Sequence, residues 1–318
     1  MKVSITKGEL FAIMAAVLWG VNYLLVKKVL QEISQGQFML IRFVLTVILL
    51  AAYLAVTKES YWIEKNHYLP IALLGILGVG LYNIVWTYGI HLTTAANAAL
   101  LISTSPVFTG IYSVFWKKEK VQFTWWCGTL LAFGGIYLII ACTPGAKFSF
   151  SSEAFLGNLL VLTGSILFAL YAILAQPLLK HYSSLQLTTF AMGGGLILLI
   201  PFSLGGTSFL GLSAISAHTW LDLIYVIVLG TVVAYVFWYK GVEQTGPVKT
   251  LVFHYLVPVV SIVMGPFLLG EKISLGQLTG GIIVFCGLLL IKLNIQLKDL
   301  APIKQNKEKK KKLANSVS

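Results

Sequence analysis

Residues 229–291 read LGTVVAYVFWYKGVEQTGPVKTLVFHYLVPVVSIVMGPFLLGEKISLGQLTGGIIVFCGLLLI, and they repeat residues 77–139, which read LGVGLYNIVWTYGIHLTTAANAALLISTSPVFTGIYSVFWKKEKVQFTWWCGTLLAFGGIYLI. At an offset of 152 the two stretches share 15 residues in 63 ungapped positions. The shared positions include a tryptophan (Trp86 and Trp238), a proline and several glycines. The chain therefore contains two copies of one structural unit.

Long apolar runs follow one another along the chain, in which 58% of the 318 residues are hydrophobic and 11% are charged. A soluble domain carries about 25% charged residues, whereas a run of about 20 apolar residues crosses a bilayer as a helix. The predicted spans are 8–27, 36–57, 69–91, 94–116, 121–142, 155–178, 185–204, 219–241, 246–269 and 274–293. An odd number of spans per copy turns the two copies in opposite directions. The predicted fold is therefore an all-α integral membrane protein of ten transmembrane helices, built as two inverted five-helix repeats.

The same pattern divides the chain. The first repeat is predicted at 8–142, the second at 155–293, and a basic, disordered tail at 294–318. Eight of the 23 Lys and Arg residues lie from Lys292 onward, with no aromatic residue among the tail lysines, so the tail favours anionic lipid headgroups over nucleic acid. The excess of lysines in alternate loops places both termini in the cytoplasm. The expected location is the plasma (inner) membrane.

The sequence offers no motif for catalysis or metal binding. It has no G-x-S-x-G, H-E-x-x-H or P-loop pattern and no paired carboxylates within a span. Its three cysteines fit no metal site. We therefore expect neither an enzyme nor a cofactor, and the expected partners are a small-molecule substrate and the lipid bilayer. The oligomeric state stays open.

Several short motifs, taken in their order, resemble a known family. The second copy carries YKGVEQTG at 239–246, PVV at 258–260, LGEK at 269–272 and a glycine pair at 280–281, and the first copy carries a looser version. This arrangement resembles the EamA family of the drug/metabolite transporter superfamily, over residues 8–293. The resemblance implies a ten-helix inverted-repeat transporter, often an exporter of amino acids, other metabolites or toxic compounds.

The predicted function is secondary transport without ATP, with export of amino acids or related small metabolites by alternating access. Two alternatives remain open, namely an exchanger of sugar phosphates or nucleotide sugars and an exporter of toxic amphipathic cations. The first is disfavoured because Arg42 is the only arginine and no lysine is expected at mid-depth. Arg42 itself either snorkels to the near interface or serves as a counter-charge for an anionic substrate.

Aromatic residues are the first candidates for a substrate site. Trp86 and Trp238 correspond in the two copies, and each shares a helix face with a tyrosine, Tyr82 in the first and Tyr235 in the second. Together they predict two aromatic walls that suit apolar or cationic solutes. The competing interpretation is a belt of aromatic residues at the membrane interface.

Polar residues within apolar spans are the second group of candidates, because such residues are costly when they face lipid. Asn22 and its counterpart Tyr171 serve either helix packing or substrate contact. Asn97 and Ser103 belong to a polar stripe on the fourth span.

A histidine and two prolines complete the candidates. His254, beside Tyr255, is either the proton-handling residue or a packing histidine. Pro106 and Pro258 are predicted to interrupt spans four and nine from within, as gating points or as static bends.

Overall fold

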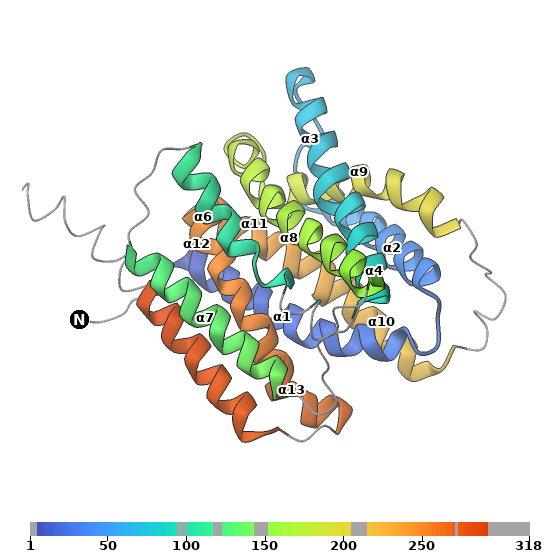
Figure 1. Ribbon diagram of the computed structural model, residues 1–318. Helices are drawn as coiled ribbons and strands as arrows, with labels where there is room; N and C mark the ends of the chain where they lie inside the picture. Colours follow the sequence, from blue (N-terminus) through green and yellow to red (C-terminus); the bar gives the residue numbers. More distant parts are fainter. Residues whose placement is uncertain are drawn as a thin grey trace, which may run out of the picture.

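The computed structural model describes residues 5–93, 98, 101–116, 123–142, 152–204, 215–270 and 273–291 (Figure 1). In this part of the chain every regular element is helical. Eight helical stretches are long and apolar enough to cross a membrane, and a shorter apolar helix follows at Leu275–Ile291. The described residues do not include Asn97, the Glu-Lys pairs that correspond in the two copies at 119–120 and 271–272, or the predicted tail at 294–318.

The helices are α1 (Lys7–Val29), α2 (Gln35–Val56), η1 (Lys65–His67), α3 (Tyr68–Gly75), η2 (Ile76–Leu81), α4 (Tyr82–Leu92), α6 (Ser105–Phe115), α7 (Phe123–Ala141), α8 (Ser152–Leu178), α9 (Ser184–Leu204), α10 (Ala217–Ile227), η4 (Val228–Val233), α11 (Ala234–Thr245), α12 (Pro247–Val252), η5 (Phe253–Tyr255) and α13 (Leu256–Leu269). The elements from η1 to α4 form one continuous span, as do those from α10 to α11 and from α12 to α13.

Local sequence fixes where several spans begin. Thr6 caps α1 and exchanges hydrogen bonds with Glu9, and a serine–glutamine pair does the same at the start of α2. Ser274 and Gln277 form the same reciprocal pair at the start of the last helix. These pairs satisfy backbone N–H groups that the first helical turn leaves without partners. Each helix start is thus encoded by a few neighbouring residues.

The packing of the helices follows the sequence repeat. α1 packs against α11 and α13, while its counterpart α8 packs against α4 and α6, the counterparts of those partners. α2 packs against its own counterpart, α9. Figure 1 shows α1, in blue, running through the bundle between these elements.

Glycines bring α7 and the last helix into close contact, and Figure 1 shows the two helices side by side. A Cβ atom on Gly135 would lie 2.7 Å from the carbonyl oxygen of Gly280, and one on Gly128 would lie 2.8 Å from that of Gly287. Because Gly128 corresponds to Gly280 and Gly135 to Gly287, the same contact occurs twice, related by the repeat. Small residues permit this approach of two backbones.

Each copy contains a π-helical turn at the same place, η2 at Ile76–Leu81 and η4 at Val228–Val233. Such turns widen a helix locally and are frequent at functional sites. The sequence pattern did not predict them, because a single inserted residue leaves the apolar run unbroken.

Each of the two repeat prolines follows a break in the α-helix of its span. Pro106 lies in the first turn of α6, and Pro258 is the third residue of α13. The span is interrupted just before each of them, and their role as gating points or static bends stays a prediction. A turn at residues 103–104 precedes α6, and the 3-10 turn η5 precedes α13. Proline is well tolerated in a first turn, where its missing N–H group has no helical partner to lose.

Candidate functional site

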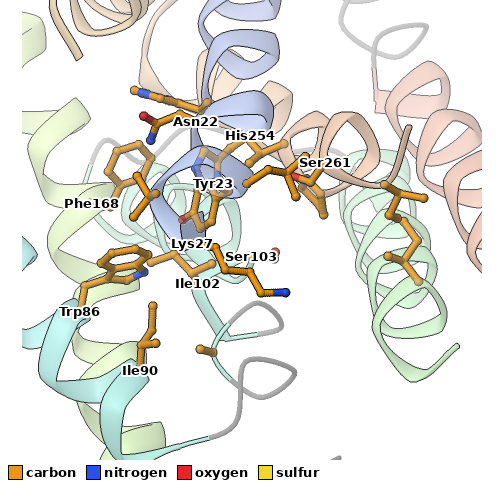
Figure 2. Close-up of a pocket in the computed structure, with 18 of the residues that line it drawn as sticks. Asn22, Tyr23, Lys27, Trp86, Ile90, Ile102, Ser103, Phe168, His254 and Ser261 are labelled. Carbon is orange, nitrogen blue, oxygen red and sulfur yellow. The ribbon is translucent and has the colours of Figure 1, made fainter. Parts of the chain in front are cut away.

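A cavity of about 450 Å³ lies between α1, α4, α8 and the second half of the ninth span. Figure 2 shows side chains converging on it from these elements. Its described lining is Trp19, Asn22, Tyr23, Leu24, Val26, Lys27, Leu30, Arg42, Tyr82, Asn83, Trp86, Ile90, Ala98, Ile102, Ser103, Ile139, Phe168, Tyr235, His254, Val257, Pro258, Ser261, Ile262, Pro266, Ile273 and Gln277. The volume suits a small metabolite.

The cavity extends from the middle of the bundle to one end of it. Its deep part is formed by residues halfway along their helices, such as Trp19 and Phe168, and its mouth includes the exposed Lys27 and Leu30 at the end of α1. α4 and α13 also end on this side, where they contribute Ile90 and Pro266. The mouth therefore lies at the end of the bundle opposite the start of α1.

Aromatic side chains close the other end. Trp238 is 0% exposed, and its ring centroid lies 5.0 Å from that of Trp19 and 5.5 Å from that of Phe168. Tyr239, the next residue along α11, stacks on Tyr171 with ring centroids 5.0 Å apart. These rings therefore fill the bundle beyond Trp19 and Phe168, on the side away from the mouth.

Both interrupted spans meet the cavity at their breaks. Ile102 and Ser103 line it from the break before α6, and His254 lines it from η5. The His254 ring lies 4.9 Å from the Phe168 ring and 5.8 Å from the Trp19 ring, measured between centroids. Discontinuous helices at a central cavity are typical of inverted-repeat transporters.

The π-helical turns receive the side chains of the corresponding residues Asn22 and Tyr171. The Cβ position of Gly230 in η4 falls against Asn22, and that of Gly78 in η2 falls against Tyr171. A side chain at either glycine would therefore collide with its neighbour. Asn22 and Tyr171 thus occupy equivalent places in the two copies, but only Asn22 reaches the cavity.

Two polar side chains of the first copy bind the π-helical turn of the second. Trp19 donates from Nε1 to the carbonyl oxygen of Gly230 at 3.1 Å, and Arg42 donates from Nε to Oγ1 of Thr231 at 2.8 Å. The Arg42 guanidinium carbon also lies 5.1 Å from the centre of the Phe43 ring. Arg42 is 7% exposed, so a cation lies deep within the bundle, at the edge of the cavity.

A family model described as the EamA-like transporter family matches residues 6–141 and again residues 155–293. The chain belongs to this family. EamA-like transporters with spans of this kind are multi-pass integral membrane proteins, and so is this chain. Large apolar side chains exposed on the outer faces of the helices, such as Ile197 and Phe202 on α9, agree with contact to lipid.

Relatives of this EamA protein carry transporter names. An uncharacterized transporter of Archaeoglobus fulgidus is 29% identical over 90% of this chain and 97% of its own length. The uncharacterized transporter YetK of Bacillus subtilis is 27% identical over 90% of this chain and 86% of its own. A probable terminal-alkyne amino-acid exporter of Streptantibioticus cattleyicolor is 25% identical over 70% of this chain and 72% of its own. A solved crystal structure shares the fold with a TM-score of 0.79 at 16% identity, covering 91% of this chain and 98% of that one.

The structure brings most of the candidate residues of this EamA protein to one cavity. The candidates that line it are Asn22, Tyr82, Trp86, Ser103, Tyr235, Pro258 and His254. The others described are packed away from it, namely Tyr171, Trp238, Tyr255 and Pro106.

Sequence reasoning did not single out several lining residues. Trp19, Tyr23, Phe168 and Ser261 line the cavity but are not among the predicted site residues. Tyr23 follows Asn22 and lies one turn from Trp19 and from Lys27, so the spacing of polar and aromatic residues along α1 was the available signal. Arg42 was weighed for an anionic substrate but not included among the candidates.

Polar contacts tie the end of α1 and the α1–α2 loop to the start of α10, at the same end as the mouth. Glu32 accepts hydrogen bonds at 2.9 Å from the backbone N–H and from the hydroxyl of Ser216. The pKa of Glu32 is lowered mainly by the Ser216 N–H group, and also by the Thr219 and Ser216 hydroxyls. Lys28 and Asp222 form an ion pair of 3.1 Å beside this contact.

Proposed function

We propose that this protein is a secondary transporter that exports amino acids or related small metabolites by alternating access, through the described cavity. The observation that carries the proposal is a cavity that extends from the middle of the bundle to one end of it and is lined where two spans are interrupted. It is further supported by the printed name of one relative, a probable terminal-alkyne amino-acid exporter.

The unequal environments of Trp86 and Trp238 support alternating access. These residues correspond in the two copies, yet Trp86 lines the cavity while Trp238 is completely buried. In an inverted-repeat transporter, the two halves exchange conformations when access changes sides. In the opposite state, we propose, Trp238 lines a cavity at the other end and Trp86 is buried.

The finer architecture is part of the same proposal. We propose ten spans, with five in each of the halves 8–142 and 155–293, and both termini in the cytoplasm. The support is the doubled contact between α7 and the last helix and the equal placing of the π-helical turns. On this topology the mouth beside Lys27 faces outward. The breaks before Pro106 and Pro258 are proposed as the points where the fourth and ninth spans change direction during gating.

Efflux from liposomes tests this function. Purified protein is reconstituted in liposomes loaded with amino acids, amines, carboxylic acids, nucleotides and sugar phosphates, and mass spectrometry identifies the solutes that escape. We expect selective loss of amino acids or related acids, reduced by Trp86→Ala. Selective loss of sugar phosphates or of amines would replace the proposed substrate class. If no solute escapes faster than from protein-free liposomes, the transport proposal is wrong.

A further inference from the structure

Arg42 presents a buried positive charge for which the described residues supply no acid. It is the only arginine of the chain, it is 7% exposed, and it lines the cavity. Its hydrogen bond to Thr231 uses Nε alone. The Phe38 and Phe43 ring centroids lie 5.7 Å and 5.1 Å from its guanidinium carbon, and Tyr23, Tyr82 and Tyr235 line the same cavity.

A buried charge needs compensation, because removing it from water costs several kcal/mol and one neutral hydrogen bond repays only part of this. Of the five N–H donors in a guanidinium, the four on Nη1 and Nη2 make no hydrogen bond to any described residue. Because Nε is tied to η4, the fork has a fixed position at the cavity edge. Such a fork matches the two oxygens of a carboxylate.

The charged side chains of the described lining favour an anionic substrate over a cationic one. Its cationic side chains are Arg42 deep in the cavity and Lys27 at the mouth, and it contains neither Asp nor Glu. A substrate cation therefore finds no counter-charge among these residues, whereas an anion finds one in Arg42. A single deep arginine among aromatic rings fits a monoanion that carries an apolar group better than a phosphate dianion.

We propose that Arg42 is the carboxylate-binding residue of the transport site, and that the substrates are small carboxylic acids with an apolar side group. The proposal deepens the transport function proposed above and rests on it. The carboxylate binds the Nη groups, and the apolar part lies among Trp19, Phe168 and Tyr235. Neutral groups such as the Asn22 amide accommodate an α-ammonium group. The carboxylate is therefore required, and an ammonium group is dispensable.

A matched series of four probes tests this in the purified full-length protein. 3-Phenylpropionate, 3-phenylpropionamide, phenethylamine and phenyl phosphate are compared by their effect on thermal unfolding in detergent, since a ligand that binds the folded state raises the unfolding temperature. We expect 3-phenylpropionate to stabilise the protein, and the amide and the amine to bind about 10- to 100-fold more weakly, as the loss of hydrogen bonds to a charged group implies. Equal binding of amide or amine, or stronger binding of the phosphate than of the carboxylate, would overturn the proposal.

Variants locate the effect at Arg42. Arg42→Gln should lose the preference for the acid over the amide, and Arg42→Lys should keep the charge but bind the acid more weakly than the native protein. Lys240→Gln is the control, because Lys240 also lies over an aromatic ring, that of Phe11 at 5.3 Å, but does not line the cavity. An unchanged acid preference in Arg42→Lys and Arg42→Gln contradicts the assignment. If Arg42→Gln does not fold, the probe series and Arg42→Lys still decide.

The same probes in the efflux experiment separate this inference from the transport function. If acids leave the liposomes and the Arg42 variants abolish this efflux, the result supports both the carboxylate site and the transport function. Efflux of amides and amines as fast as that of acids keeps the transport function and rejects the carboxylate site. Acid-selective stabilisation without efflux of any solute supports the site and rejects transport.

Discussion

Arg42 of α2 and Thr231 of η4 are joined by a hydrogen bond of 2.8 Å that links the two copies of the repeat. Thr231 in turn donates to the carbonyl oxygen of Val226 in α10, five residues back, at 2.7 Å. The corresponding residues of the other copy are Ala191 and Val79, which have no side-chain donor. The scaffold is thus doubled, but this polar link occurs on one side of the pseudo-symmetry only.

Thr231→Val should therefore destabilise the protein, because it leaves the buried Nε of Arg42 without its acceptor. Hydrogen bonds to charged groups contribute about 1.5–3 kcal/mol. The matched control is Thr163→Val on α8, where the hydroxyl donates to the Leu159 carbonyl at an exposed position. Thermal unfolding in detergent should show a clear loss for Thr231→Val and little change for Thr163→Val. Equal behaviour of the two variants would mean that the link is not stabilising.

Adjacent glycines on α7 test the close crossing with the last helix. Gly135→Ala places a methyl group 2.7 Å from a backbone oxygen of Gly280, whereas the Cβ of Gly134→Ala meets no atom within 4 Å. Overpacking of this kind costs about 1–3 kcal/mol. We expect the first variant to unfold at a lower temperature and the second to match the native protein. A Gly135→Ala variant as stable as Gly134→Ala would contradict the crossing.

The paired tryptophans should respond differently to truncation. Trp238→Ala removes a completely buried ring, so it should reduce the free energy of unfolding by about 3–5 kcal/mol. Trp86→Ala removes a ring that lines the cavity, so it should slow efflux with a smaller loss of stability. Thermal unfolding and liposome efflux, measured on both variants, check this. The reverse pattern would place the cavity around Trp238.

The contact of Glu32 with Ser216 predicts a response to acid at the end of the bundle that holds the cavity mouth. The pKa of this carboxylate is lowered in the folded protein, so its contribution to stability is complete above its ordinary pKa of 4.5 and is lost as the pH falls through the lowered value. Between pH 6 and 8 it should therefore add no pH dependence. Glu32→Gln should unfold at a lower temperature than the native protein at pH 7, and the difference should shrink in strong acid. A difference that persists unchanged at low pH would contradict this account.

Much of the fold could be predicted from the sequence, because helices that cross lipid must be long and apolar and because the repeat is visible as shared residues. The details that shape the cavity were less accessible. A π-helical turn such as η4 differs from an α-helix by one residue of register, which composition does not reveal. Pro106 and Pro258 indicate interruptions of the fourth and ninth spans, but no local pattern specifies the long-range contacts at the breaks, such as that of Thr104 with Ser165 at 2.9 Å.

The types of residue at the candidate site could be predicted from the sequence, but not which of these side chains face the cavity. The correspondence of Trp86 with Trp238 predicts two equal walls, whereas the structure buries Trp238 completely and leaves Trp86 lining the cavity. Arg42 was recognisable as a charged residue within a span. Its place at the cavity edge depends on how α2 packs against η4, which is a long-range contact.

The central claim is that solutes pass through the cavity, and thiol labelling of two neighbouring positions tests it most directly. In a background with Cys127, Cys142 and Cys286 changed to Ala, Ser103→Cys places a thiol at the cavity, and Ser105→Cys places one in a completely buried position two residues away. A membrane-impermeant thiol reagent added outside intact cells should label Ser103→Cys, spare Ser105→Cys, and block efflux through the labelled variant. Failure to label Ser103→Cys, or undiminished efflux after its complete labelling, would contradict the account.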